Sequence, residues 1–209
     1  ILHDSSKTHE MDGVAFNYTL RQPIGVAACI SPWNLPLYLL TWKVAPAIAA
    51  GNTVVAKPSE VTPMTAYLFS KICIEAGLPK GVLNIVHGLG SKIGDPLTTH
   101  LDTPVESFTG GTATGKHIAT VTAPMFKKLS LEMGGKNPNI IFADADFEKA
   151  VSMASRAAFT NQGQICLCGS RLFVEEKIYE KFKKALINKT KLLKVGDPKS
   201  SNSNLGAVV

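Results

Sequence analysis

The sequence lacks any apolar segment long enough to cross a bilayer, and it has few cysteines. The longest apolar run, "LPLYLLTW" at residues 35–42, is followed at once by Lys43, whereas a spanning helix needs about 20 apolar residues. Four cysteines in 209 residues are too few and too scattered for the disulfide framework of a small secreted domain. These absences predict a chain that does not associate with membranes and that folds in a reducing, intracellular setting.

Charged residues are also sparse, at 18%, while hydrophobic residues make up 45% of the chain. This composition predicts a globular protein of one or two domains. The net charge of +6 comes largely from lysines within residues 175–194, which have the apolar spacing of a helix. A basic helix can bind nucleic acid, but acidic residues are mixed with these lysines, and Phe182 belongs to the apolar face. We therefore expect a solvated helix face and no nucleic-acid partner.

Short apolar and β-branched runs alternate with helical patterns through residues 24–122. This order predicts parallel strands joined by crossover helices. The expected fold class is α/β, a doubly wound parallel sheet of the Rossmann-like, dinucleotide-binding kind, followed by the start of a second α/β domain. The expected strands are residues 24–30, 52–57, 82–88 and 105–110, and the expected helices are residues 35–50, 63–76, 91–100 and 112–122, with Thr62 capping the second helix.

Beyond Pro124 the pattern changes to an alternating, exposed strand at residues 127–135 and a second strand at residues 137–143. We place a domain boundary near Gly134 and Gly135, which gives a partial dinucleotide-binding domain over residues 24–134 and a second domain over residues 135–209. Residues 1–23, where Phe16, Tyr18 and Leu20 alternate weakly, are expected to form a strand of an oligomerisation or bridging segment that pairs outside this unit.

The segment "TNQGQICLCGSR" places Cys166 and Cys168 two residues apart. Such a pair could be half of a zinc site, but structural zinc needs four ligands and no second pair exists. Cys29 and Cys73 lie in an expected strand and an expected helix. A disulfide between residues two apart would be strained, and two buried apolar cysteines would be the ordinary arrangement. We predict no metal site.

The context of Cys166 favours a chemical role for this cysteine. It follows Gly163, where a helix ends and a strand begins, so its thiolate could be exposed to attack an electrophilic carbon. Cys168, beside the small Gly169, is as compatible with packing.

A nucleophile needs a base and a group that stabilises developing charge. Glu132, in "LSLEMGGK", shares its expected strand with apolar residues and precedes two glycines. It is either a solvated charge or a general base in a semi-apolar pocket. Asn34, in "SPWNLP", either caps the following helix or donates its amide N–H to an oxyanion.

No G-x-G-x-x-G motif is present, but "FTGGTATG" places Gly110, Gly111 and Gly115 between a strand and a helix. Glycines there let a phosphate reach the helix N-terminus. Lys57 and Glu60, in "AKPSE", follow the second strand, at the sheet edge where a doubly wound sheet binds its ligand. A carboxylate there can accept hydrogen bonds from both ribose hydroxyls and would repel a 2′-phosphate, which favours NAD over NADP.

Together, "SPWNLP", "GNTVVAKPSE", "FTGG", "LEMGGKNP" and "NQGQICLCGSR" resemble the aldehyde dehydrogenase superfamily in order and separation, from about Thr19 to about Gly206. The amino-acid sequences of these segments are most similar to the 2-aminomuconate and hydroxymuconic semialdehyde dehydrogenase branch. The resemblance implies NAD-dependent oxidation of an aldehyde, and of a semialdehyde in that branch, to a carboxylic acid through a cysteine thiohemiacetal and thioester. It also implies a small-molecule aldehyde as substrate, a cytoplasmic homodimer or homotetramer, and a catalytic function for residues 135–209.

The resemblance further implies a role for each matching position. Cys166 matches the nucleophile, Asn34 and the Cys166 backbone N–H match the oxyanion hole, and Glu132 matches the base that activates the thiol or the deacylating water. Cys168 is then a bystander. The positions that match cofactor contacts are Ser31, Trp33, Lys57, Glu60, Gly110, Gly111, Gly115 and Gly134.

The chain departs from the family pattern in two ways. Gly111 stands where the family often has serine, so a hydroxyl contact to phosphate is lost. The downstream glutamate-phenylalanine motif of the family has no match before Val209. Because the chain also begins at Ile1 rather than methionine, we expect a fragment of an enzyme about twice as long, inactive alone, and a targeting sequence ahead of Ile1 stays open.

Two rival functions stay open. A CoA-acylating or phosphate-dependent enzyme would pass the acyl group to a thiol or phosphate, but the carboxylate of Glu132 suits hydrolysis. A non-catalytic dinucleotide-binding scaffold is the other rival, and the joint presence of Asn34, Glu132 and Cys166 argues against it.

Overall fold

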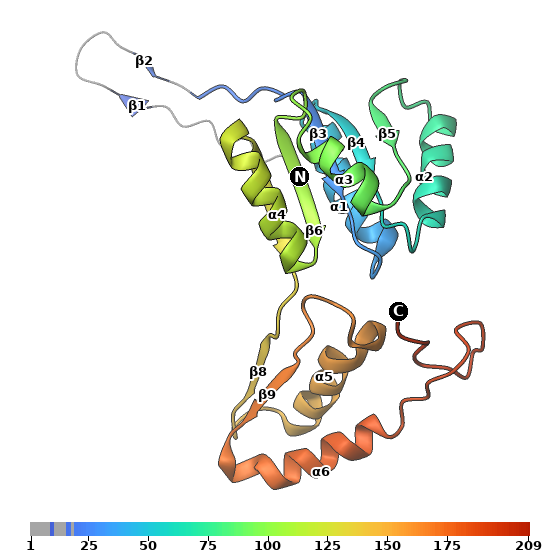
Figure 1. Cartoon of the computed structure of the whole chain (residues 1–209). Helices are drawn as coiled ribbons and strands as arrows, with labels where there is room; N and C mark the ends of the chain where they lie inside the picture. The colour runs from blue at the N-terminus through green and yellow to red at the C-terminus, as the bar shows by residue number, and fades with distance from the viewer. Residues whose placement is uncertain (1–8, 11–15, 18) are drawn as a thin grey trace. The chain divides into compact units, whose positions relative to one another are not determined.

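The computed structural model describes residues 9–10, 16–17 and 19–209 of the chain (Figure 1). It divides into two compact units, Ile1–Glu132 and Met133–Val209. We call them the first and second unit, and each has its own sheet and its own core.

The first unit is built on a five-stranded sheet in the order β5-β4-β3-β6-β7. β3 pairs in parallel with both β4 and β6, and β4 pairs in parallel with β5. The chain therefore places β4 and β5 on one side of β3, and then β6 and β7 on the other side. This order confirms the predicted doubly wound α/β fold. The strands are β3 (Val26–Ile30), β4 (Thr53–Lys57), β5 (Leu83–Ile85), β6 (Val105–Gly110) and β7 (Lys128–Met133).

Helices cover both faces of this sheet. α1 packs on β3, β4 and α2, whereas α3 packs on α4, and Figure 1 shows α1 behind the sheet and α3 in front of it. The central strand is consequently buried on both faces, as expected for a parallel sheet. The helices are α1 (Pro36–Ala49), α2 (Met64–Glu75), α3 (Gly90–Thr98), α4 (Thr112–Thr122) and the short 3-10 helix η1 (Ala123–Met125).

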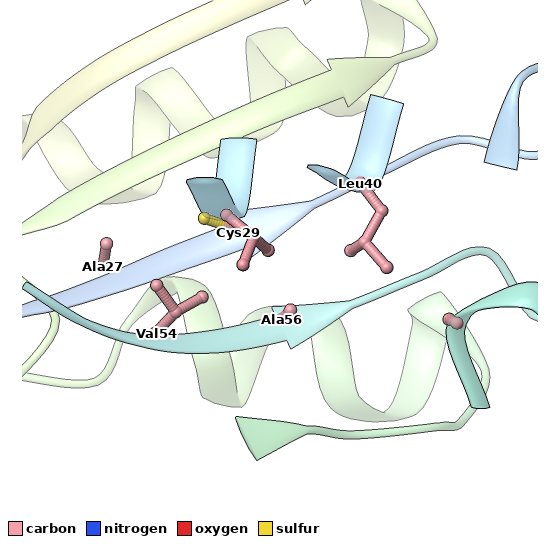
Figure 2. Packing of buried hydrophobic residues seen from close by; sticks show 7 residues of the cluster. Ala27, Cys29, Leu40, Val54 and Ala56 are labelled. Atoms are coloured by element: carbon pink, nitrogen blue, oxygen red, sulfur yellow. The ribbon is translucent and has the colours of Figure 1, made fainter. Parts of the chain in front are cut away.

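The core of the first unit joins β3, β4 and α1. Cys29 of β3, Val54 of β4 and Leu40 of α1 are almost fully buried against one another (Figure 2). After α1 the chain turns at Gly51, whose φ is +83° and whose added Cβ would lie 2.7 Å from Pro23 Cγ. Glycine is required there, because any other side chain would be strained and would clash.

The start of α2 differs from its prediction. Its N-cap position is Pro63, with no side-chain cap, and the Thr62 hydroxyl instead donates to the carbonyl of Trp33 at 3.4 Å. The predicted Thr62 cap was therefore wrong, because a contact with a distant loop replaces the local one.

The second unit is a βαβ arrangement with an additional helix. β8 (Pro138–Ile141) and β9 (Arg171–Val174) pair in parallel, and α5 (Phe147–Phe159) connects them through the 3-10 helix η2 (Thr160–Gly163). After η3 (Glu176–Ile178), α6 (Tyr179–Thr190) packs on α5. The shared core consists of Ile141, Val151, Ala154 and Phe182.

A small antiparallel pair lies in the N-terminal region. β1 (His9–Glu10) pairs with β2 (Phe16–Asn17). Phe16 thus lies in a strand as expected, Leu20 follows it outside any strand, and Tyr18 lies outside the described residues. The expected role of residues 1–23 as an oligomerisation or bridging segment stays a prediction.

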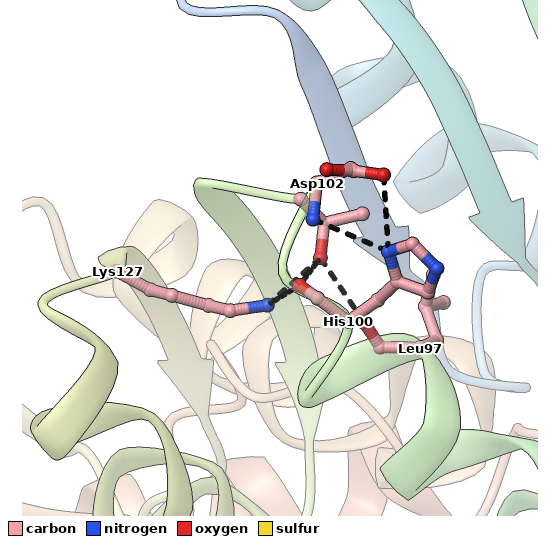
Figure 3. A network of polar contacts seen from close by, with 5 residues as sticks. Leu97, His100, Asp102 and Lys127 are labelled. Carbon is pink, nitrogen blue, oxygen red and sulfur yellow. Dashed lines mark hydrogen bonds and ion pairs between the residues drawn. The ribbon is translucent and has the colours of Figure 1, made fainter.

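Glu106 of β6 is fully buried. Its Oε1 accepts a hydrogen bond from the Thr98 hydroxyl at 3.1 Å, while no described residue bonds to Oε2. Lys127, whose Nζ donates to the His100 carbonyl at 2.6 Å and to the Thr103 hydroxyl at 2.8 Å (Figure 3), attracts the carboxylate. Burial outweighs this attraction and raises the pKa of Glu106.

We expect Glu106→Gln to stabilise the chain by about 1–2 kcal/mol at neutral pH, because it removes a buried charge with an unsatisfied oxygen. The folded state holds the Glu106 proton more tightly than the unfolded state, so the free energy of unfolding falls as pH rises from about 4.3 to the raised pKa. Thermal unfolding between about pH 4 and pH 8 measures this slope, which the variant should lose. Equal stability of both proteins at every pH would contradict the expectation, and the exposed Glu75→Gln serves as control.

Candidate functional site

A cavity of about 370 Å³ lies where the chain switches direction across the sheet, at the carboxyl ends of β3, β4 and β6. Doubly wound sheets bind ligands at this edge. We call it the switch-point cavity. Six of the residues predicted to bind a cofactor line it, namely Ser31, Trp33, Lys57, Glu60, Gly110 and Gly111.

The other two predicted cofactor residues lie elsewhere. Gly115 is buried within α4, where its N–H donates to the carbonyl of Gly111 at 3.0 Å. Gly134 lies in the second unit, in the segment between β7 and β8. Gly115 is therefore a helix residue that does not line the cavity, and the cofactor contact expected of Gly134 stays a prediction.

The N-terminus of α4 opens into the cavity. Its N-cap is Gly111, which supplies no side-chain cap, so the first N–H groups of the helix keep their capacity to bind an anion. Gly110 has no room for a side chain, because an added Cβ would lie 2.5 Å from the Phe108 ring. Backbone groups at this turn can consequently approach a phosphate without a side chain between them.

Lys57 and Glu60 form an ion pair at the cavity, with 3.0 Å between Lys57 Nζ and Glu60 Oε2. The Lys57 side chain is buried, and its Nζ also donates to the carbonyl of Pro58 at 3.1 Å. Hydrogen bonds from the Glu60 backbone N–H and from Lys57 lower the pKa of Glu60. At neutral pH the cavity thus has a half-exposed carboxylate that can accept hydrogen bonds from ligand hydroxyls.

Ser31 provides an independent sign that the cavity accepts a polar ligand. Its side chain is 3% exposed, it lines the cavity, and its Oγ has no hydrogen-bond partner among the described residues. Buried hydroxyls are normally hydrogen-bonded. An anion-binding helix end, a ribose-accepting carboxylate and an unsatisfied hydroxyl together fit a dinucleotide such as NAD.

The sequence did not reveal two further polar groups in this cavity. Asp95 of α3 and His117 of α4 both line it, and their side chains meet with 2.8 Å between Oδ1 and Nε2. Their proximity depends on the packing of α3 against α4, which no local pattern indicates.

Asn34 follows β3 and is half-buried. The N-cap position of α1 is Leu35, which makes no side-chain capping bond. Asn34 therefore lies one residue ahead of the N-cap rather than at it.

Glu132 is the last residue of the first unit, and its side chain is exposed. The expected semi-apolar pocket around it was wrong, because Leu129 and Leu131 are directed to the other side of the alternating strand. Lys43 of α1, which the sequence analysis did not single out, is buried and donates to the Ser107 hydroxyl at 3.1 Å. Burial lowers the pKa of Lys43, and the attraction of Cys29 and Glu132 opposes this shift.

Cys29, also in the first unit, has a thiol of low reactivity. Burial raises the pKa of its thiol to about 11, against an opposing attraction from Lys43. This cysteine is a packing residue of the core.

Cys166 lies in the second unit, in a β-turn of residues Ile165–Cys168 that we call the cysteine turn. The Cys168 N–H donates to the Ile165 carbonyl at 3.0 Å and closes it. Cys166 is half-buried and occupies the second position, Leu167 is 81% exposed, and Cys168 is buried. The predicted contrast between an accessible Cys166 and a packed Cys168 agrees with this burial.

The described part of the chain holds neither a disulfide nor a cluster of metal ligands. Cys29, Cys73, Cys166 and Cys168 are all free thiols, and no three potential His, Cys, Asp or Glu ligands cluster there. None of the described helices is long and apolar enough to cross a membrane.

Comparison with known proteins places these features in a family. The aldehyde dehydrogenase family profile matches residues 2–209. The chain is 53% identical over 210 residues to 2-aminomuconic semialdehyde dehydrogenase of Danio rerio, with 100% of the chain and 43% of that protein covered. It thus spans less than half the length of this curated relative.

Two solved structures are similar to nearly the whole chain. Betaine aldehyde dehydrogenase from Staphylococcus aureus in complex with NAD+ has a TM-score of 0.92 at 41% identity, covering 98% of this chain and 41% of that one. A variant of the aldehyde dehydrogenase from Bacillus cereus has a TM-score of 0.95 at 40% identity, covering 99% and 42%.

Proposed function

Because the chain belongs to the aldehyde dehydrogenase family, we propose that the protein containing it oxidises an aldehyde to a carboxylic acid with NAD as electron acceptor. The observation that carries the proposal is the switch-point cavity, whose groups fit a dinucleotide. Curated relatives support a semialdehyde as the substrate class, since those of Danio rerio and Homo sapiens are named 2-aminomuconic semialdehyde dehydrogenases.

Residues of the first unit would hold the cofactor. The N-terminus of α4, with Gly110 and Gly111, binds the phosphates, and Glu60, held by Lys57, accepts hydrogen bonds from ribose hydroxyls. Ser31 adds a buried donor. The chemistry that NAD supplies when bound is the acceptance of two electrons from the substrate.

The catalytic cycle begins at Cys166. Its thiolate attacks the aldehyde carbon and forms a C–S bond, and the Asn34 amide and the Cys166 N–H stabilise the resulting alkoxide. Oxidation of this thiohemiacetal leaves a thioester. Glu132 takes a proton from a water molecule that attacks the thioester, and cleavage of the C–S bond releases the acid and the thiolate.

The domain assignment follows these roles. We assign residues 24–134 to a partial dinucleotide-binding domain that also supplies Asn34 and Glu132, and residues 135–209, with Cys166, to the N-terminal part of a catalytic domain, in a cytoplasmic homodimer or homotetramer. The free state of all four cysteines supports a reducing compartment. Family membership supports the oligomer.

We expect Glu60→Ala to weaken NAD binding by about tenfold while changing NADP binding less, because it removes ribose acceptors and a charge that repels a 2′-phosphate. Calorimetric titration with both nucleotides measures the ratio of the two dissociation constants. The control is Asp102→Asn. Asp102 is exposed and precedes β6, so it lies at the end of the strands opposite the switch-point cavity. Unchanged affinity for NAD in the Glu60 variant would contradict this assignment.

Product analysis tests the proposed reaction. The full-length protein is incubated with NAD and a semialdehyde, with and without CoA or phosphate, while NADH and the acyl product are followed. We expect NADH and free acid in equal amounts without either additive. An acyl-CoA or acyl phosphate product would show that the enzyme transfers the acyl group instead of hydrolysing the thioester. Absence of NADH with every aldehyde would favour a non-catalytic dinucleotide-binding scaffold.

A further inference from the structure

The side chain of Asn137 bonds to the cysteine turn from outside it. Asn137 lies immediately before β8, 29 residues from Cys166 in the sequence. Its Nδ2 donates to the carbonyl of Cys166 at 2.5 Å and to the carbonyl of Cys168 at 3.1 Å. Both N–H groups of the Asn137 amide therefore bond to the turn that carries the proposed nucleophile, Cys166.

The backbone of Asn137 strengthens this connection. Its carbonyl accepts a hydrogen bond from the Arg171 N–H at 3.1 Å, which begins the β8–β9 ladder directly after the turn. The Asn137 side chain is thus anchored to the sheet of the second unit, and the turn is tied to that rigid element rather than to a loop.

The other side of the turn is closely packed. The Gly169 N–H donates to the Ala157 carbonyl of α5 at 3.1 Å. An added Cβ at Gly169 would lie 3.1 Å from Asn139 Cβ and 3.2 Å from its Nδ2. The turn is therefore fixed on one side by α5 and Asn139, and on the other by the Asn137 amide.

The segment before the turn explains why such anchoring is needed. Asn161, Gln162 and Gly163 have φ values of 52°, 58° and 75°, so three consecutive residues adopt the left-handed conformation. That conformation is unfavourable for residues other than glycine, least so for asparagine. Residues in such a conformation persist where surrounding contacts hold them, and the bonds of the Asn137 amide to the adjacent turn are contacts of this kind.

The chemistry of the contact selects asparagine. Two carbonyls converge on one nitrogen, so the side chain must supply two N–H donors from a short stem. Aspartate has the same shape but presents only oxygens to the two carbonyls, which would repel them. Serine supplies one donor and could satisfy one carbonyl.

We propose that Asn137 is a positioning residue for Cys166. By fixing the Cys166 and Cys168 carbonyls, it fixes the peptide planes of the turn, and with them the direction of the Cys166 thiol and backbone N–H. It acts through the turn and touches neither substrate nor cofactor. The inference rests on the proposed function of Cys166 as nucleophile.

The test compares Asn137→Asp and Asn137→Ser with wild type in the full-length protein. We expect Asn137→Asp to lower kcat by about 10- to 100-fold, because roughly 1 Å of displacement of a reacting group costs rates of this size. The KM for NAD should change less than about threefold, since the cofactor groups lie in the first unit. The kcat of Asn137→Ser should lie between the kcat of wild type and that of Asn137→Asp. Asn188→Asp, an exposed position on α6 with the same change of charge, should behave like wild type.

Hydrogen exchange supplies a readout independent of activity. The Cys168 N–H, which closes the turn, should exchange about tenfold or more faster in Asn137→Asp, while amides of β3 and β4 stay protected. Faster exchange with unchanged kcat would overturn the positioning role, and so would unchanged exchange.

The remaining outcomes are also informative. If Asn137→Asp does not fold, Asn137→Ser decides by the same two criteria. If Cys166→Ala keeps full activity, the proposed function fails, whereas the exchange measurement still reports whether Asn137 holds the turn.

Discussion

Cys166→Ala is expected to lower kcat of the full-length protein by about 10⁴-fold or more, because it removes the protein atom that bonds to the substrate carbon in the proposed cycle. Cys166 is half-buried at the corner of a turn, and Cys73, in α2 of the first unit, is half-buried as well. Cys29 and Cys168 are buried. Steady-state formation of NADH with saturating aldehyde and NAD measures the loss.

Cys168→Ala is the matched control, two residues away in the same turn. It should keep kcat within about threefold, because its thiol packs against the protein and takes no part in bonding. Binding of NAD should be unchanged in both variants, since the switch-point cavity lies in the first unit. An active Cys166→Ala variant, or a Cys168→Ala variant as inactive as Cys166→Ala, would refute the assignment of the nucleophile.

The second large effect is expected for Glu132→Gln, which should lower steady-state kcat by about 10²- to 10⁴-fold. The amide is nearly isosteric with the carboxylate but cannot take a proton from water. If Glu132 activates the deacylating water, rapid mixing should show a burst of about one NADH per active site followed by slow turnover. If it activates the thiol, the burst itself should be slow.

The exposed Glu75→Gln, at the end of α2, controls for the change of charge and should leave both phases unchanged. Unaltered turnover in Glu132→Gln would remove Glu132 from the mechanism. The exposure of Glu132 in the first unit makes this a demanding test, because an exposed carboxylate is more often a solvated charge.

Local sequence patterns were sufficient for most of the sheet. The helix at residues 112–122 and the strand at residues 105–110 have the predicted bounds, because glycines mark the turn between them. The parallel order followed from the alternation of strands and helices. The position of the switch-point cavity followed in turn, since parallel strands end at one edge of the sheet.

Contacts between distant residues were not predictable in the same way. Lys43 looked like the polar end of an apolar run, yet it is buried against Ser107 of β6. Glu106 occupies a strand position that gives no sign of burial until Thr98 of α3 is packed over it. Asn137 was expected only as the first residue of a strand, and the fold shows that its amide reaches the cysteine turn.

Mass spectrometry of an acyl-enzyme tests the proposed chemistry most directly. The full-length Glu132→Gln protein, mixed with NAD and a semialdehyde and quenched in acid, is digested and its cysteine peptides are sequenced. We predict an added acyl group on Cys166 that depends on both NAD and aldehyde, that hydroxylamine removes, and that is absent from Cys168. No acyl group on any cysteine during active turnover, or an acyl group on a cysteine other than Cys166, would contradict the thioester mechanism proposed for this chain.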